Sequence, residues 1–109
     1  MNVVKVMGGL GNQLFQYSFG YIQRLRGKDT RYDLHWFNYP QNERYPRPCR
    51  LGYFNIDIPK MLFIRHNRKV HEKFIFDLTH LDAEHTNFDG YWQFLGYYQP
   101  YIDELRKLF

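Results

Sequence analysis

Residues 2–20 read NVVKVMGGLGNQLFQYSFG, and this stretch decides the fold that we expect. The β-branched apolar run at residues 2–7 stops at glycine, which predicts a first strand buried on both faces. From Asn12 to about Arg26 the pattern predicts an amphipathic helix, with Asn12 as its N-cap and Gly27 as its stop. The apolar face of this helix is expected to hold Phe15, Ser18, Phe19, Ile22 and Leu25, whereas Gln16, Gln23, Arg24 and Arg26 lie elsewhere.

The following residues complete a βαβ pattern. TRYDLHWF, at residues 30–37, predicts a second strand, so strand, glycine turn, helix and strand indicate a unit with a right-handed crossover. Residues 38–50 hold three of the five prolines and predict a surface loop. Further strands are expected at residues 51–58, 74–76 and 87–94, and a helix at residues 98–109, with Pro100 in its first turn. Residues 60–73 give no assignment. The predicted class is α/β, a Rossmann-like βαβ half-domain with a parallel sheet.

The composition of the chain limits the kinds of function that it can have. The 109 residues suffice for one small domain, and 10 Phe, 10 Tyr and 2 Trp indicate either a thick core or a surface that something else covers. The net charge of +4 favours anionic partners only weakly, because acids lie among the basic residues. A solvated basic face is the favoured interpretation. Cys49 is the only cysteine, so no internal disulfide forms. Neither a signal peptide nor a bilayer-spanning stretch is apparent, which predicts a soluble cytoplasmic chain.

The glycine turn is the strongest candidate site. Glycines before a helix let the backbone approach an anion, and the first amides of the helix have no partner within it. Gly8, Gly9 and Gly11, followed by Asn12, have this layout. The alternative is that the glycines serve only the turn. The dinucleotide fingerprint GxGxxG fails because Leu14 stands at its third glycine position, and the P-loop pattern fails as well.

Other constellations are weaker. His66 and His71, and likewise His80 and His85, are five residues apart, which does not suit metal ligands on one helical face. No spacing marks a Ser/His/Asp triad. One group of aromatic residues could stack on sugars or bases, or form core: Phe88, Tyr91, Trp92, Tyr97 and Tyr98.

GGLGNQLFQYSFG, at residues 8–20, resembles the N-terminal signature GGLGNQ[ML]FQYAFG of the bacterial α-1,2-fucosyltransferases, glycosyltransferase family 11. The resemblance continues in YDL and WF at residues 32–37, FNI at residues 54–56 and FIFDLTHL from Phe74. It ends in DGYWQFLGYYQPYIDELRKLF from Asp89, which is similar to the family's GYWQ strand and the helix after it. Ordered blocks over nearly the whole chain carry the resemblance.

The resemblance implies transfer of L-fucose from GDP-fucose to the 2-hydroxyl of a galactose-containing glycan, with inversion and without a metal or other cofactor. It implies the N-terminal half of a GT-B-type glycosyltransferase. Gly9, Gly11, Asn12 and Gln13 would lie near the donor pyrophosphate, and Asn12 would donate to a phosphate or sugar oxygen. Tyr91, Trp92 and Gln93 would support the cleft or touch the acceptor. No nucleic-acid partner is expected, and peripheral association with the inner membrane stays open.

This sequence also departs from the family. Full-length members are more than twice as long and carry a His-x-Arg-Arg-Gly-Asp block that occurs nowhere here. We therefore expect residues 1–109 to be the N-terminal portion, without the C-terminal donor-binding half and inactive alone, although the general base is unknown. The alternatives are a non-catalytic nucleotide- or glycan-binding module and, with least support, a nucleic-acid binder.

Overall fold

The computed structural model of the chain describes residues 1–38, 47–61, 67–72 and 77–109. The strands and longer helices are β1 (Asn2–Lys5), α1 (Leu10–Leu25), β2 (Thr30–Asp33), β3 (Arg68–His71), β4 (Thr86–Asp89) and α2 (Ile102–Arg106). Short 3-10 helices lie between them at His35–Asn38, Leu51–Tyr53, Leu78–Asp82, Leu95–Tyr97 and Gln99–Tyr101.

The strands form a parallel sheet in the order β2-β1-β4-β3. β1 pairs with β2 on one side, where Asn2 lies opposite Thr30, and with β4 on the other, where Val4 lies opposite Phe88. Since β1, α1 and β2 follow one another and β1 and β2 are parallel neighbours, the predicted βαβ unit is confirmed. The chain has an α/β fold consistent with a Rossmann-like half-domain.

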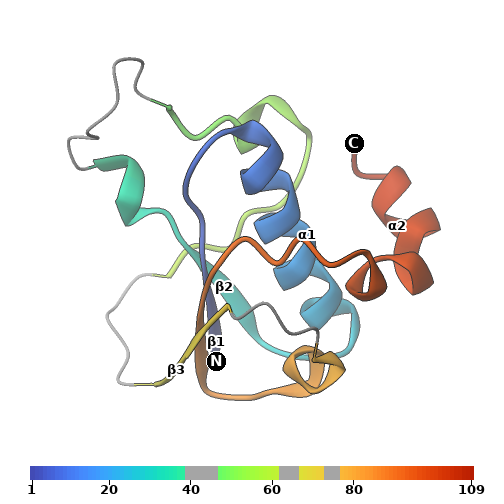
Figure 1. Cartoon of the computed structure of the whole chain (residues 1–109). Helices are drawn as coiled ribbons and strands as arrows, with labels where there is room; N and C mark the ends of the chain where they lie inside the picture. The colour runs from blue at the N-terminus through green and yellow to red at the C-terminus, as the bar shows by residue number, and fades with distance from the viewer. Residues whose placement is uncertain (39–46, 62–66, 73–76) are drawn as a thin grey trace.

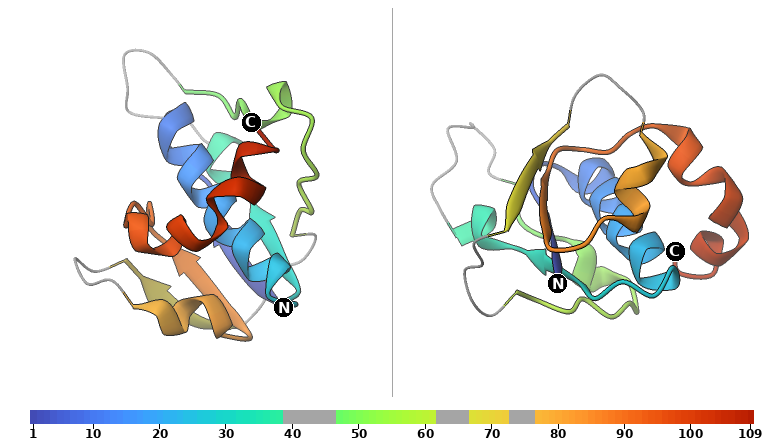
Figure 2. Two further views of the ribbon diagram at one scale, coloured as in Figure 1. Left: turned by 90° about the vertical axis from the view of Figure 1, so that its right-hand side faces the viewer. Right: turned by 90° about the horizontal axis from the view of Figure 1, so that it is seen from below.

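α1 packs against one face of this sheet and forms the centre of the core. Val4 and Phe88 of the strands and Phe19 of α1 are each at most 1% exposed. The Phe19 ring stacks on Trp92 with centroids 4.6 Å apart and meets Tyr97 edge-on at 5.3 Å. Figures 1 and 2 show α1 between the sheet and the C-terminal segment that carries α2. Many of the aromatic residues therefore fill a core that extends beyond α1.

α1 differs from the predicted helix at its start and on its faces. It begins at Leu10 with Gly9 as its N-cap, so the prediction of Asn12 as N-cap is wrong. Gln16 and Gln23 are fully buried, although the pattern placed them outside the apolar face, and Leu25 is 44% exposed. The reason is that the sheet and the C-terminal segment cover α1 from two sides, which leaves little of its surface to solvent. The helix ends at Leu25 and Gly27 follows with φ +83°, as a C-terminal stop requires.

The later predicted elements hold only in part. The second strand ends at Asp33, because its carboxylate accepts the His35 N–H and a 3-10 helix follows. The prediction of a strand over residues 51–58 is wrong, since Leu51–Tyr53 form a 3-10 helix. The strand with an internal turn expected at residues 87–94 holds only as far as β4 and the bend at Gly90, because residues 91–94 are not a strand. β3 lies in the stretch that gave no assignment.

The predicted C-terminal helix over residues 98–109 is shorter in the structure. α2 spans Ile102–Arg106, and Pro100 lies in the first turn of the preceding 3-10 helix. The expected strand at residues 74–76 and residues 39–46 of the expected loop lie outside the described residues.

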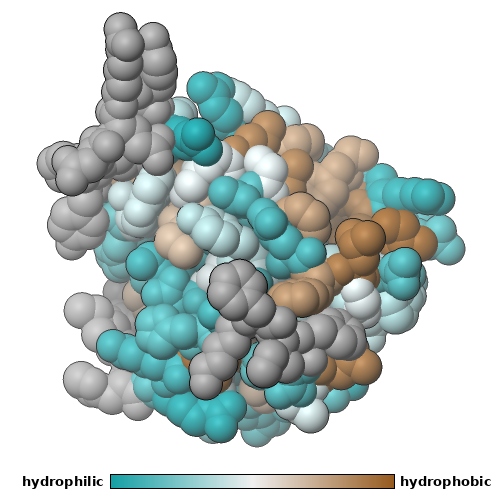
Figure 3. Space-filling model, viewed as in Figure 1, coloured by the Kyte–Doolittle hydropathy of each residue, from teal (hydrophilic) through white to brown (hydrophobic). Residues whose placement is uncertain are grey.

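The surface is divided by polarity. In the view of Figure 3, apolar residues gather on the right, where Figure 1 places the C-terminal segment, and hydrophilic residues prevail at the lower left. Exposed apolar side chains of this segment include Leu95 (64%), Ile102 (44%) and Phe109 (45%). Among the described residues, no helix is both long enough and apolar enough to cross a membrane.

Candidate functional site at the switch point of the sheet

The strand order creates a switch point between β1 and β4. From β1 the chain passes through α1 to β2 on one side, whereas β4 pairs with the other side of β1. In open parallel sheets, ligands bind beside the carboxyl ends of the two strands at such a point. Here these ends continue into the glycine turn, residues 8–11, and into residues 90–93. Topology therefore brings together the two segments that carry the predicted site residues.

The glycine turn is shaped by two different glycines. Gly8 has φ +80°, a conformation that glycine adopts without strain, and it turns the chain from β1 into α1. Gly11 lies exposed in the first turn of α1, and a Cβ built on it would have no neighbouring atom within 4 Å. Gly11 thus leaves open space directly over the backbone.

The amides at the start of α1 precede its hydrogen-bonded ladder. The Gln13 N–H donates to the Gly9 carbonyl at 3.0 Å, so the N–H groups of Leu10, Gly11 and Asn12 have no acceptor within the helix. No side chain caps this end, and no acidic residue lies in the first turn. The helix dipole is positive here, so the arrangement suits a negatively charged group.

Gln13 lies behind the turn. Its side chain is fully buried, with Nε2 donating to the carbonyls of Gly8 and Pro48 and Oε1 accepting from the Arg50 N–H. Because these three bonds occupy the side-chain amide, Gln13 positions the glycine turn from the protein side. Of the four residues expected at the pyrophosphate, Gly9, Gly11 and Asn12 therefore remain as candidates for direct contact.

Gln16 joins the two strand ends, a role that the sequence pattern did not reveal. It is fully buried, accepts the Met7 N–H at 2.9 Å and donates to the Gly90 carbonyl at 2.8 Å. The helical pattern gave no signal for this role, because it placed Gln16 outside the apolar face. Its two bonds fix the distance between the glycine turn and the turn after β4.

Residues 91–93 form the second wall. The Gln93 Nε2 donates to the Asn12 Oδ1 at 2.6 Å, which links the two walls directly. The Tyr91 ring is 40% exposed and would lie 3.6 Å from a Cβ on Gly8, so it borders the glycine turn. Tyr91 and Gln93 thus lie beside the glycine turn and Asn12 at the switch point. Residues 9–13 and residues 91–93 are therefore close enough to belong to one site.

Trp92 points the other way. It is 1% exposed, has φ +57° and packs against the rings of the core. The Glu72 carboxylate accepts the N–H groups of Tyr91 and Trp92, and the Tyr98 hydroxyl donates to the Trp92 carbonyl. Burial raises the pKa of Tyr98, which keeps this hydroxyl protonated as a donor. Trp92 is therefore a support of the wall and not a surface for an acceptor.

Arg47 adds a cation that the sequence pattern did not single out. A Cβ on Gly9 would come 2.7 Å from the Arg47 Nη1, so the guanidinium lies against the backbone of the glycine turn. Arg47 lies within a proline-rich stretch without periodicity, which is why its position could not be anticipated. Its charge reinforces the positive end of α1.

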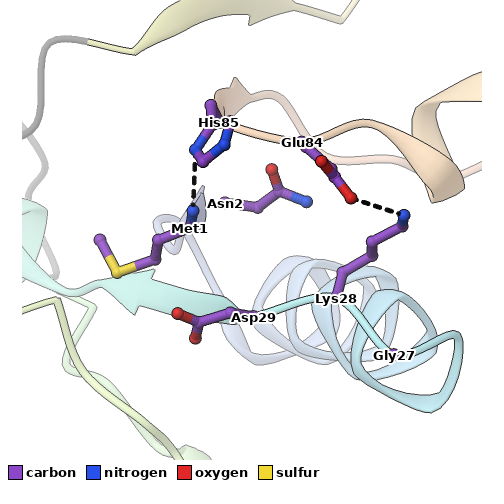
Figure 4. Close-up of a pocket in the computed structure, with 7 residues that line it drawn as sticks. All are labelled: Met1, Asn2, Gly27, Lys28, Asp29, Glu84 and His85. Atoms are coloured by element: carbon purple, nitrogen blue, oxygen red, sulfur yellow. Dashed lines mark hydrogen bonds and ion pairs between the residues drawn. The ribbon is translucent and has the colours of Figure 1, made fainter.

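A pocket lies at the opposite edge of the sheet. Its volume is about 220 Å³, and it is lined by Met1, Asn2, Gly27, Lys28, Asp29, Glu84 and His85. Figure 4 shows the Met1 amino group bonded to His85 and Lys28 bonded to Glu84, so two of its cations already have partners. Because it lies at the amino ends of the strands, it is separate from the switch point.

The described residues contain no group of three or more His, Cys, Asp or Glu side chains that could hold a metal ion. Comparisons with protein-family models, with curated proteins and with solved structures find no match to this chain.

Proposed function

We propose that this chain is the N-terminal, Rossmann-like part of a GDP-fucose-dependent α-1,2-fucosyltransferase, and that its glycine turn binds the donor diphosphate. The observation that carries the proposal is the open backbone of Gly11 at the start of α1, located at the switch point. The GGLGNQ signature supplies the family and the substrate class, and the physical argument for an anion stands beside it.

The residues of the turn would act on the leaving group. As the bond between the fucose anomeric carbon and the phosphate oxygen breaks, negative charge accumulates on GDP. The amides of Leu10, Gly11 and Asn12 and the Arg47 guanidinium would stabilise that charge. Since the Asn12 Oδ1 accepts from Gln93, its Nδ2 is the group left to donate to the donor substrate.

Residues 91–93 would form the side of the cleft that faces the acceptor. Tyr91 offers a half-exposed ring, and Gln93 holds Asn12 in place. A complete cleft of this type needs a second half-domain, which in the family carries the His-x-Arg-Arg-Gly-Asp block. We therefore propose binding without appreciable transfer for this chain alone.

Calorimetric titration with GDP tests the proposal. Asn12→Ala removes the donor and should weaken binding, whereas Gly52→Ala should leave it unchanged. Gly52 is a matched control for changes at Gly11, because it is also exposed and also has no atom within 4 Å of an added Cβ. Equal GDP binding by wild type, Asn12→Ala and Gly11→Ala would remove the glycine turn from the account.

Transfer is tested separately. The chain is incubated with GDP-fucose and a β-galactoside, and release of GDP is followed. Rapid transfer would contradict the proposed dependence on a second half-domain, while GDP binding without transfer is the expected result.

A further inference from the structure

Every strand of the sheet ends in an ionisable residue at its carboxyl end. These last residues are Lys5 of β1, Asp33 of β2, His71 of β3 and Asp89 of β4. The register places Lys5 opposite Asp33 and His71 opposite Asp89. Because Val4 lies opposite Phe88, the next residues, Lys5 and Asp89, are also neighbours. The four side chains therefore form a row across the sheet, which we call the strand-end row.

This row lies on the face of the sheet opposite α1. Val4 and Phe88 belong to the core beneath α1, and neighbouring residues of a strand point to opposite faces. Lys5 and Asp89 therefore project from the other face, where each side chain is 37% exposed. The row ends at the same edge of the sheet as the glycine turn, on the strands β1 and β4 that define the switch point.

Asp89 differs from most other carboxylates of the protein. Its contacts are two long ion pairs, to the Lys5 Nζ at 3.9 Å and to the His71 Nδ1 at 3.6 Å, both beyond hydrogen-bond distance. Its carboxylate accepts no hydrogen bond within the described part of the chain. Hydrogen bonds do engage the carboxylates of Asp33, Asp57, Glu72, Asp77, Asp82 and Glu84.

An aromatic ring lies two residues further along the chain. Tyr91 follows Asp89 and Gly90, and its ring borders the glycine turn. A partly exposed carboxylate that accepts no hydrogen bond from the described residues, paired with two basic side chains and followed two residues later by an exposed ring, suits a neutral ligand with hydroxyl groups. Hydroxyls donate to the carboxylate, and the ring can cover an apolar face of a sugar.

We infer that the strand-end row binds the hydroxyl groups of a neutral pyranoside, with Asp89 as the principal acceptor of their hydrogen bonds. This inference rests on the proposed function in taking that pyranoside to be the galactoside acceptor. Lys5 and His71 position the Asp89 carboxylate, and the donor diphosphate lies beside it at the start of α1. The two substrates thus meet at the end of β1 and β4.

Nitrogen-15 correlation spectra of the whole chain, titrated with methyl β-D-galactopyranoside, test the inference. Saturable shifts are expected at the amides around Lys5 and from Asp89 to Tyr91. Asp89→Asn keeps the shape of the side chain and should weaken binding roughly tenfold, because hydrogen bonds to a charged acceptor are the stronger ones. The spectrum of the variant also reports whether it folds.

Asp29→Asn is the matched control. Asp29 is also held only by a long ion pair, to the Arg31 Nε at 3.6 Å, but it lies before β2 at the other edge of the sheet. Galactoside binding by Asp29→Asn should equal that of the wild type. Absence of saturable shifts in the wild type, or equal binding by Asp89→Asn, would overturn the inference.

A GDP titration of the same sample separates this result from the proposed function. GDP binding at the start of α1 without galactoside binding would overturn only the strand-end row. Galactoside binding that depends on Asp89, without GDP binding, would support the row and count against the proposed donor site.

Discussion

Replacing Gly11 with alanine should strengthen the fold and weaken the binding of GDP, two effects of opposite sign. The new methyl group meets no atom within 4 Å, so it causes no clash. Alanine is preferred to glycine in a helix by up to about 1 kcal/mol, and we expect roughly half of that in the first turn. The free energy of unfolding should therefore rise by about 0.5 kcal/mol.

The same methyl group would occupy the space that the diphosphate needs. If it prevents one charge-assisted hydrogen bond to the backbone, the loss is about 1.5–3 kcal/mol, or roughly a tenfold to hundredfold weaker affinity for GDP. Urea denaturation measures the first effect and calorimetry measures the second. Gly52→Ala should not alter GDP affinity, because its equally open position lies in the 3-10 helix Leu51–Tyr53 and not in the first turn of α1. Unchanged affinity in folded Gly11→Ala would refute the reasoning.

Three further predictions concern the supports of the site. Gln16→Ala loses the bonds to the Met7 N–H and the Gly90 carbonyl and should lower the free energy of unfolding by about 2–3 kcal/mol. The exposed Gln99→Ala is the control and should change it little. Equal denaturation midpoints for the two variants would count against a structural role for the Gln16 bonds. Gly90→Ala should destabilise by roughly 2 kcal/mol or more, measured as a lower melting temperature, because its Cβ would overlap the Glu72 Cβ and come 3.3 Å from the Glu72 Cα. Hydrogen bonds from Arg26 lower the pKa of the Asp82 carboxyl, so the ion pair contributes stability above the ordinary pKa of aspartate and loses it as pH falls through the lowered value. Asp82→Asn should therefore have a lower urea midpoint than wild type at pH 7, and the difference should shrink as pH falls below the ordinary pKa of aspartate. A difference independent of pH would exclude this linkage.

The first half of the fold could be predicted because its signals are local. The apolar run of β1, the glycines and the periodicity of α1 are contiguous in sequence, and they predicted the βαβ unit. α1 begins at Leu10, two residues before the predicted start at Asn12. β3 gave no signal, because RKVH at a sheet edge has three basic residues and one apolar residue. Edge strands are commonly charged, so the pattern that marks a buried strand is absent there.

The site could be predicted only in part, since its geometry depends on distant partners. The signature singled out Gly11, Asn12 and Gln93, but their meeting at one switch point depends on strand order and on the bond from Gln93 to Asn12, which no local pattern contains. The burial of Gln13 follows from Pro48 and Arg50, and that of Gln16 from Gly90, none of which a helical pattern can reveal. Trp92 was ambiguous for a related reason, because its inward direction comes from a backbone conformation with φ +57°.

The central claim is that the first amides of α1 bind a diphosphate. The most direct measurement is a GDP titration followed by nitrogen-15 correlation spectra with assigned amides. The account predicts saturable shifts at Leu10, Gly11 and Asn12, with no change at Lys28 and His85 in the opposite pocket. Shifts confined to that pocket, or no shifts at residues 10–12 at saturating GDP, would contradict it.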